Sequence, residues 1–332
     1  MTTGHLLEVD DLVRTFPMRL GLSGMLNGGQ RPMVRALSGV TLSVERAETL
    51  AVVGESGCGK STLARTLVRL IEADSGQILF EGGDVRTLRG EALRRYNRRV
   101  QMVFQDPYGS LNPRMTVGEM LGEALLVHNL VPPGQRAARI AELLELVRLP
   151  ASATTRLPHE FSGGQRQRIA IARALSVEPE LLIADEIVSS LDVSVQAQIL
   201  NLLLDLQQQL GLAIMFVSHD LRVVRHIAHR VAIMYLGRVV EIGPAEQVFD
   251  RPRHPYTQAL LRAAPTMEPP PEGVRPSAGE PALAGELPSP LAIPPGCPFH
   301  PRCPAVRAEC KRDVPRVHMT DDGHLATCHL LG

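Results

Sequence analysis

The chain of 332 residues contains no tryptophan, few aromatic residues and no excess of charge of either sign. Aromatic side chains make up only 3% of it, and 35 basic side chains balance 35 acidic ones. Proteins that bind nucleic acid usually present a basic surface, so this balance argues against a nucleic-acid partner. The sequence also lacks a signal-peptide pattern at its start and an apolar run long enough to cross a bilayer. These absences predict a cytosolic chain without a membrane span of its own.

Cysteine is scarce and unevenly distributed. Four of the five cysteines follow position 296, namely Cys297, Cys303, Cys310 and Cys328. The reducing cytosol disfavours disulfides, so this cluster predicts a metal site. Four thiolates satisfy either a tetrahedral zinc ion or a four-iron four-sulfur (4Fe-4S) cluster, and unligated thiols are the third alternative. His300 and His329 lie nearby in the sequence and are candidate substitute ligands.

Hydrophobic residues, at 44%, are abundant enough for one large or two smaller domains. Short β-branched runs before residue 54 predict strands, and residues 75–84 predict a hairpin. Residues 107–164 have mainly helical spacing and indicate an inserted helical subdomain. Beyond them, helical patterns alternate with buried strands, which predicts a mainly parallel sheet with helices on both faces. Residues 265–295 contain ten prolines and predict an extended connector to the cysteine-rich tail.

A phosphate-binding loop is predicted at residues 54–62, GESGCGKST, which match G-x-x-x-x-G-K-[ST] between a buried strand and a helix. Its glycines let backbone N–H groups converge on a β-phosphate at a helix N-terminus. Lys60 would pair with the β- and γ-phosphates, and the Ser61 hydroxyl would ligate Mg²⁺. The nucleotide-binding residues expected here are Gly54, Glu55, Ser56, Gly57, Cys58, Gly59, Lys60, Ser61 and Thr62. A solvated glycine-rich turn is the alternative.

Acidic and imidazole side chains follow two later apolar strands. The run LLIADE ends in Asp185, which would hold Mg²⁺ through water, and Glu186, which would deprotonate the attacking water. The alternative is that these acids cap the next helix. His219 also ends an apolar strand, at the sheet edge where parallel strands present ligand groups, and would contact the γ-phosphate unless it is structural.

A second anion-binding turn is predicted at residues 161–168, FSGGQRQR, where a serine and two glycines precede a helical run. Together with GESGCGKST, LLIADE, SSLD and SHD, in this order, it resembles the nucleotide-binding subunits of ABC transporters over residues 6–250. The resemblance implies that two cassettes pack head to tail, each closing over the ATP of the other. The residues that would face the partner's ATP are Ser162, Gly163, Gly164 and Gln165. An ordinary capped helix start is the alternative reading.

The same resemblance implies further roles and one departure. Gln105 would be the Q-loop residue that senses Mg²⁺ and water, Asp192 would belong to the D-loop, and Phe16 would stack on adenine. For Phe16, a place in the hydrophobic core is an equal alternative. Ile187 follows Glu186 where the family usually has proline or a small turn-former, which predicts a less rigid turn.

The implied fold is α/β, a P-loop NTPase of the ABC cassette type over residues 1–250. It has a RecA-like core with a mainly parallel sheet, an N-terminal antiparallel β-subdomain and the helical subdomain at about 107–164. A C-terminal extension would occupy residues 251–295, and the cysteine-rich tail residues 296–332.

The C-terminal stretches RHPYTQALLRAAPT, GELPSP and GCPFHPRCP are similar to the extension of oligopeptide and dipeptide permease ATPase subunits. This similarity implies an ATP-hydrolysing subunit of a peptide importer, peripheral on the cytoplasmic face of the membrane. Its implied partners are a second, different ATPase, two membrane permease subunits and an extracytoplasmic solute-binding protein. Together with the uneven cysteine spacing, it favours the 4Fe-4S cluster over zinc. Alternatives are import of nickel or another small solute, a soluble ABC protein that acts on nucleic acid, and an iron–sulfur redox module.

Overall fold

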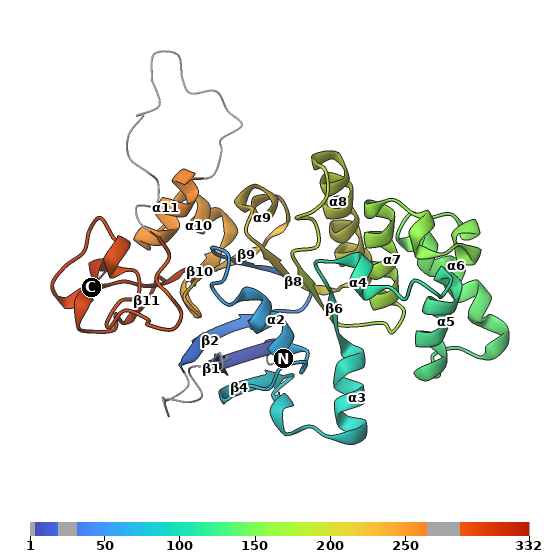
Figure 1. Ribbon diagram of the computed structural model, residues 1–332, viewed down its shortest axis with the longest axis horizontal. Coiled ribbons are helices and arrows are strands. Elements are labelled where there is room, and N and C mark those ends of the chain that lie inside the picture. Colours follow the sequence, from blue (N-terminus) through green and yellow to red (C-terminus); the bar gives the residue numbers. More distant parts are fainter. Residues whose placement is uncertain (1–3, 19–31, 264–285, 332) are drawn as a thin grey trace, which may run out of the picture.

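The computed structural model describes residues 4–18, 32–263 and 286–331, which form two sheets and the helices around them (Figure 1). Most of the glycine-rich stretch predicted between residues 18 and 32 lies outside these ranges. So does the larger part of the predicted proline-rich connector.

The N-terminal sheet has four strands in the order β2-β1-β4-β5, and all its pairs are antiparallel. Its strands are β1 Leu7–Pro17, β2 Met33–Val44, β4 Ser75–Phe80 and β5 Gly83–Asp84. The β4–β5 pair is the hairpin that the sequence predicts. The predicted N-terminal antiparallel subdomain is therefore confirmed.

The main sheet has eight strands in the order β11-β12-β10-β9-β3-β8-β7-β6. Neighbours from β9 to β6 pair in parallel, and the remaining pairs are antiparallel. The bounds are β3 Thr49–Val53, β6 Val100–Val103, β7 Leu181–Asp185, β8 Ala213–Ser218, β9 Arg230–Tyr235, β10 Arg238–Pro244, β11 Val317–Met319 and β12 Leu325–Thr327. The parallel part is the mainly parallel sheet expected from the sequence.

Successive side chains of the parallel strands enter two different hydrophobic cores. Ala51 and Val53 of β3 belong to a core shared with the helical insert and the helices that follow it, while Leu50 and Val52 belong to a core shared with α2 and the small sheet. Both faces are covered, which explains why β3, β7 and β8 are buried at every position. The helices that pack around the main sheet are α2 Lys60–Leu67, α3 Gly90–Arg99, α7 Gly163–Leu175, α8 Val193–Leu210, α9 Leu221–Ile227, α10 Ala245–Asp250 and α11 Pro255–Ala263.

The helical insert lies at one end of the molecule, beyond α7 (Figure 1). Its helices are α4 Pro107–Ser110, α5 Val117–Val127 and α6 Arg136–Leu146. Helix α5 begins with a capping box in which the Thr116 side chain accepts from the Glu119 N–H and the Glu119 side chain accepts from the Thr116 N–H. The predicted helical insertion is thus present between β6 and α7.

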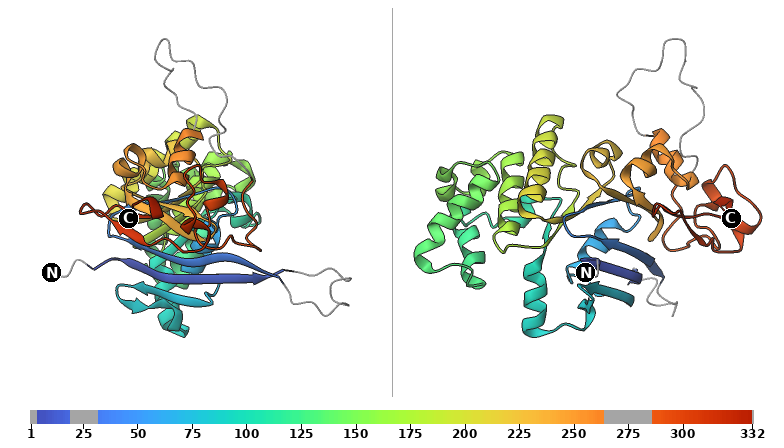
Figure 2. Two further views of the ribbon diagram at one scale, coloured as in Figure 1. Left: turned by 90° about the vertical axis from the view of Figure 1, so that its left-hand side faces the viewer. Right: turned by 180° about the vertical axis from the view of Figure 1, so that it is seen from behind.

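The cysteine-rich tail lies at the opposite end, beside α10 and α11 (Figure 2). Its strands β11 and β12 extend the main sheet beyond β10. Its Phe299 is 1% exposed and packs against Tyr235 of β9 and Tyr256 of α11, with ring centroids 5.4 Å apart in both pairs. The tail therefore shares both the sheet and the hydrophobic core of the cassette.

Candidate functional site

The predicted phosphate-binding loop joins the end of β3 to the start of α2. Gly59 caps α2 with a left-handed φ of 110°, and a Cβ at this position would lie 2.3 Å from the Ala36 carbonyl oxygen. A Cβ on Gly54 would lie 2.3 Å from the carbonyl oxygen of Met234. Both positions therefore require glycine, because the neighbouring backbone cannot move aside easily. Cys58 is 1% exposed, and burial raises the pKa of its thiol, so it fills space beneath the loop.

A pocket of about 410 Å³ lies over this loop. Its lining residues are Phe16, Val34, Ala36, Ser56, Gly57, Gly59, Lys60, Ser61, Thr62, Gln105, Glu186 and Pro290. Phe16 is half-buried at the pocket wall, and the Arg14 guanidinium carbon lies 4.7 Å from its ring centroid. The alternative of a core position for Phe16 is therefore wrong, and its ring is available to a ligand in the pocket.

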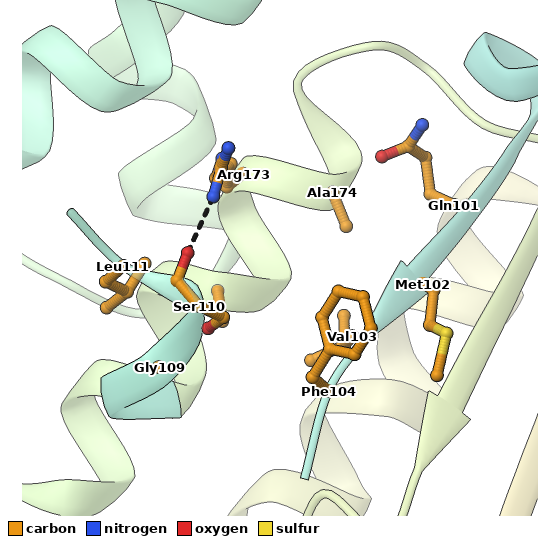
Figure 3. Close-up of a pocket in the computed structure, with 10 residues that line it drawn as sticks. Gln101, Met102, Val103, Phe104, Gly109, Ser110, Leu111, Arg173 and Ala174 are labelled. Carbon is orange, nitrogen blue, oxygen red and sulfur yellow. Dashed lines mark hydrogen bonds between the residues drawn. The ribbon is translucent and has the colours of Figure 1, made fainter. Parts of the chain in front are cut away.

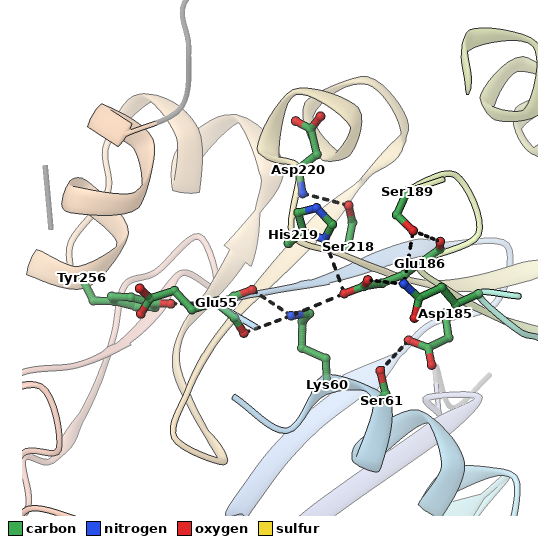
Figure 4. A network of polar contacts seen from close by, with 12 residues as sticks. Glu55, Lys60, Ser61, Asp185, Glu186, Ser189, Ser218, His219, Asp220 and Tyr256 are labelled. Carbon is green, nitrogen blue, oxygen red and sulfur yellow. Dashed lines mark hydrogen bonds and ion pairs between the residues drawn. The ribbon is translucent and has the colours of Figure 1, made fainter. Parts of the chain in front are cut away.

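The Lys60 side chain is only 4% exposed, and its ammonium group is directed into the loop. Its Nζ donates to the carbonyl oxygens of Gly54 and Glu55, at 2.8 Å and 3.1 Å, and lies 3.8 Å from Glu186 Oε1 (Figure 4). A buried ammonium group surrounded by carbonyl oxygens and one carboxylate suits a polyanionic ligand, which would take over these contacts.

Ser61 and Asp185 form a pair suited to a divalent cation. The Ser61 hydroxyl at the start of α2 donates to Asp185 Oδ1 at the end of β7, at 3.0 Å. Asp185 is 2% exposed, and burial raises the pKa of its carboxyl group. Oxygen ligands beside a phosphate cradle are those that Mg²⁺ prefers, and a bound cation would favour the ionised carboxylate. These residues therefore fit Mg²⁺.

Glu186 lies at the carboxyl ends of three neighbouring parallel strands and contacts side chains that follow the other two. Its Oε2 accepts from Gln105 Nε2 at 3.2 Å, and its Oε1 lies 3.5 Å from Nδ1 of His219 (Figure 4). Gln105 follows β6, Glu186 follows β7 and His219 follows β8, and all three strands run in the same direction. The arrangement surrounds one carboxylate with a cation, an amide and an imidazole, as a base that activates water requires.

The helix-cap alternative for Asp185 and Glu186 is not what the structure shows. The N-cap of α8 is Asp192, whose carboxylate accepts from the Val195 N–H at 2.9 Å, a hydrogen bond that lowers the pKa of Asp192. Glu186 instead has a left-handed φ of 50°, and its N–H donates to the Val217 carbonyl oxygen at 3.0 Å.

Ile187 is 1% exposed and packs in the larger hydrophobic core. The next turn is held by Ser189, whose N–H and hydroxyl both donate to the Glu186 carbonyl oxygen, at 3.2 Å and 2.9 Å. Ile187 occupies the position where the resemblance leads us to expect proline or a small turn-former. Burial of its apolar side chain in the core holds this turn in place.

The second anion-binding turn forms the N-terminus of α7. Ser162 accepts from the Gln165 N–H at 3.3 Å, and Gln165 Oε1 accepts from the Ser162 N–H at 3.0 Å. A Cβ on Gly164 would lie 2.4 Å from Cγ1 of Val195 in α8, so helix packing explains this glycine. Ser162 is exposed, and residues 162–165 are not among the described residues that line the phosphate-loop pocket.

A further pocket of about 370 Å³ lies between β6 and α7, next to the helical insert (Figure 3). Met102, Val103 and Phe104 line one side of it, and Ser110 and Arg173 the other. The Arg173 guanidinium donates to the Ser110 carbonyl oxygen at 2.7 Å. This hydrogen bond connects α7 to α4, which is the helix that follows the Gln105 segment in the chain.

The tail cysteines do not form the single-ion site that the zinc alternative requires. Within residues 286–331 and the other described ranges, no group of three or more His, Cys, Asp or Glu side chains is arranged to hold a metal ion. His300 Nδ1 and His329 Nε2 lie 2.9 Å from the backbone carbonyl oxygens of Cys297 and Asp313. Burial first, and then the other three tail thiols, raise the pKa of Cys297 to about 11.

Three residues near the phosphate loop were missed by the sequence analysis. Tyr256 and Arg302 contact Glu55, and Pro290 lines the pocket beside Phe16. All three belong to the C-terminal extension or tail, and Tyr256, the nearest in sequence, follows Glu55 by 201 residues. No local pattern connects such distant segments, so only strand pairing and core packing bring them together.

Two family models match the chain. The ABC transporter family matches residues 37–189, and the oligopeptide/dipeptide transporter C-terminal region matches residues 240–310. A probable peptide ABC transporter ATP-binding protein of Sinorhizobium fredii is 50% identical over 98% of this chain and 90% of its own length. The oligopeptide transport ATP-binding protein AppF of Bacillus subtilis is 48% identical over 98% of this chain and 97% of its own.

Solved structures with the same fold agree with these matches. The protein cbiO1 of Clostridium perfringens, part of an ABC transporter complex, has a TM-score of 0.63 and is 28% identical, over 74% of this chain and 91% of its own. A bacterial ABC transporter cassette solved as a dimer has a TM-score of 0.63 and is 26% identical, over 72% of this chain and 98% of its own. No helix in the described part of the chain is both long and apolar enough to cross a membrane.

Proposed function

The chain belongs to the ABC transporter family of ATPases, and we propose that it is the ATP-hydrolysing subunit of an importer for short peptides. Two observations support the peptide substrate: residues 240–310 match the oligopeptide/dipeptide transporter region, and the relatives are named for peptide transport. Import of nickel or another small solute is the alternative. Solute uptake by the assembled transporter, with labelled dipeptides competing against nickel, distinguishes the two.

In the proposed mechanism, Glu186 is the general base that takes a proton from the attacking water. Gln105 positions that water, and His219 contacts the γ-phosphate. Lys60 pairs with the β- and γ-phosphates, while the loop N–H groups bind the phosphate oxygens. Ser61 and Asp185 would hold Mg²⁺, which would neutralise charge on the phosphates when bound. The observation that carries this assignment is that Glu186, at the wall of the pocket, contacts Lys60, Gln105 and His219.

We also propose that the ATP site is completed by a second, different cassette. Ser162 is exposed at a helix N-terminus outside the chain's own pocket, which supports a role for Ser162, Gly163, Gly164 and Gln165 towards a partner's ATP. Asp192 of the D-loop would lie at the same interface. The test mixes Ser162→Arg with wild-type partner and membrane subunits and measures hydrolysis at each site. Loss of hydrolysis only at the site of its own Lys60 would contradict the proposal.

The membrane permease subunits are proposed to contact the pocket between β6 and α7. Its position between the Gln105 segment and the helical insert supports this, because movement of either element would reach a protein seated there. Ala174→Trp should fill the pocket and prevent assembly with the permease subunits, while ATP binding by the chain alone is unchanged. The solute-binding protein would act on the other side of the membrane, which places this chain on the cytoplasmic face.

A 4Fe-4S cluster on the four tail cysteines is proposed, since the zinc alternative requires a single-ion site that the described residues do not form. Burial, and then neighbouring tail cysteines, raise the pKa of Cys297, Cys303 and Cys328. Two tail sulfurs accept backbone N–H groups: Cys310 from Arg307 at 3.4 Å and Cys328 from Leu330 at 3.5 Å. Such hydrogen bonds to sulfur are features of cluster sites. Iron, sulfide and zinc assays on anaerobically purified protein test this. An absence of all three would leave free thiols.

A further inference from the structure

Glu55, the second residue of the phosphate loop, is held by the C-terminal part of the chain. Its carboxylate forms a two-point ion pair with Arg302, with Nη1 2.7 Å from Oε2 and Nη2 3.1 Å from Oε1. Its N–H donates to the Tyr256 hydroxyl at 3.0 Å. Two segments that lie 201 and 247 residues further along the chain thus fix one residue of the nucleotide cradle.

Arg302 is placed by the core of the tail. It lies in the 3₁₀ turn His300–Arg302, directly before Cys303, and its side chain is only 5% exposed. Its guanidinium carbon lies 6.0 Å from the ring centroid of Tyr235, which packs against Phe299 and Tyr256. A two-point ion pair at such a site has a defined geometry, because both side chains are held in single orientations.

Glu55, which forms the ion pair through its side chain, also contacts Lys60 through its backbone. The Glu55 carbonyl oxygen accepts from Lys60 Nζ at 3.1 Å, and the adjacent Gly54 carbonyl accepts from the same nitrogen at 2.8 Å. The position of the Glu55 peptide therefore helps to determine where the ammonium group lies. Pro290 of the C-terminal extension makes a further contact, since it lines the pocket and its carbonyl oxygen accepts from the Arg35 N–H at 3.2 Å.

A carboxylate in a phosphate cradle poses an electrostatic problem. ATP brings several negative charges to the loop, and an unneutralised carboxylate on a residue of that loop would repel them. Arg302 neutralises this carboxylate and holds it through both oxygens. Removal of the guanidinium would leave this carboxylate, whose side chain is 25% exposed, without its ion-pair partner.

We propose that Arg302 and Tyr256 are positioning residues for ATP binding, through which the C-terminal tail neutralises Glu55 and fixes the phosphate loop. This inference rests on the proposed function, in which the loop binds ATP. The cysteine-rich tail would then act on the ATP site of its own chain. A structured turn between Cys297 and Cys303 is needed for the loop to accept the triphosphate.

The test is a double-mutant comparison in the full chain, in a Glu186→Gln background so that hydrolysis does not interfere. Binding of a fluorescent ATP analogue is measured for Arg302→Gln, Glu55→Gln and the combination. We expect Arg302→Gln to raise the Kd about tenfold, as the exposed charge of Glu55 would. Glu55→Gln alone should change it little, and the double variant should recover most of the affinity. Arg316→Gln, an exposed arginine of the same tail, is the matched control.

Recovery by removal of the second charge separates this role from simple loss of stability, which a second mutation would not repair. Tyr256→Phe keeps the ring packing and removes only the hydroxyl, so it serves if Arg302→Gln fails to fold, and it should raise the Kd about threefold. A Kd within twofold of wild type for folded Arg302→Gln or Tyr256→Phe, or no recovery in the double variant, would overturn the inference. Lys60→Ala is the reference: unchanged binding there would refute the proposed ATP site itself, whereas loss there with no effect at Arg302 refutes only the role of the tail.

Discussion

At the scale of single residues, the site depends on contacts between charged groups that are close enough to change one another's behaviour. Glu186 lies 3.8 Å from Lys60 Nζ and 3.5 Å from His219 Nδ1, and it accepts from Gln105. These contacts hold the carboxylate in one orientation, within the pocket where a general base would meet the attacking water. Its left-handed φ indicates that the surrounding structure holds it in this place against a local preference.

Glu186→Gln should therefore separate binding from hydrolysis. The amide keeps the size and the contact with Lys60 but cannot accept the proton, so we expect kcat to fall about 10²- to 10⁴-fold while ATP affinity changes less than threefold. Phosphate release and nucleotide binding measured on the same preparation check this. Hydrolysis at the wild-type rate would remove Glu186 from the mechanism.

Phe16→Ala should raise the KM for ATP about tenfold with little change in kcat, because base stacking on an aromatic ring contributes about 1–3 kcal/mol. Phe16→Tyr keeps the ring and is the matched control. Equal KM values for the alanine variant and the wild type would show that the ring at the pocket wall does not contact adenine.

At the scale of elements, one buried polar network fastens the C-terminal elements to the sheet. Glu241 of β10 is 1% exposed, and it accepts from the N–H groups of Arg253 and His254, at 2.7 Å and 2.9 Å. His324, in the turn before β12, lies 2.7 Å from the same carboxylate. These hydrogen bonds keep the pKa of Glu241 below its usual range despite burial. The carboxylate of Glu241 therefore holds both the start of α11 and the edge of β12.

This network predicts a loss of stability in mild acid. Burial lowers the pKa of His254 to about 4, and its Nδ1 accepts from the Tyr256 N–H, which requires the neutral ring. A pKa lower in the folded than in the unfolded chain means that stability is complete above about pH 6.5 and is lost as the pH falls towards 4, by about 3 kcal/mol in total. Urea unfolding at pH 7.5 and pH 5.0 measures this. His254→Asn should flatten the dependence, and equal stabilities at both pH values would contradict it.

At the scale of the whole molecule, the tail and the cassette form one cooperative unit. Strands β11 and β12 lengthen the main sheet, and Phe299, Cys297 and Cys310 pack in the larger core. A short tail that lacks a core of its own can be ordered in this way, because the cassette supplies the buried surface. The composition change near residue 265 predicts a boundary, whereas packing joins the two sides.

Phe299→Ala should consequently destabilise the entire chain by about 3–5 kcal/mol, through loss of a fully buried ring. Val317→Ala, at a side chain that is 64% exposed, should change stability by less than about 0.5 kcal/mol. Denaturant unfolding followed by a tail-specific and a cassette-specific probe should give coincident transitions for wild type. A separate early transition of the tail would contradict this account.

The amino-acid sequence by itself determined the local features: the phosphate loop between β3 and α2, the capped start of α7, the helical insert and the parallel core strands. Each depends on neighbouring residues whose spacing sets backbone conformation and burial. Tertiary structure alone decided that Gln105, Glu186 and His219 meet at adjacent strand ends, that Phe16 lines the pocket, and that the cysteine spacing does not form a single-ion site. It also decided that Arg302 reaches Glu55. Such contacts depend on strand order and core packing, which join segments that no local pattern relates.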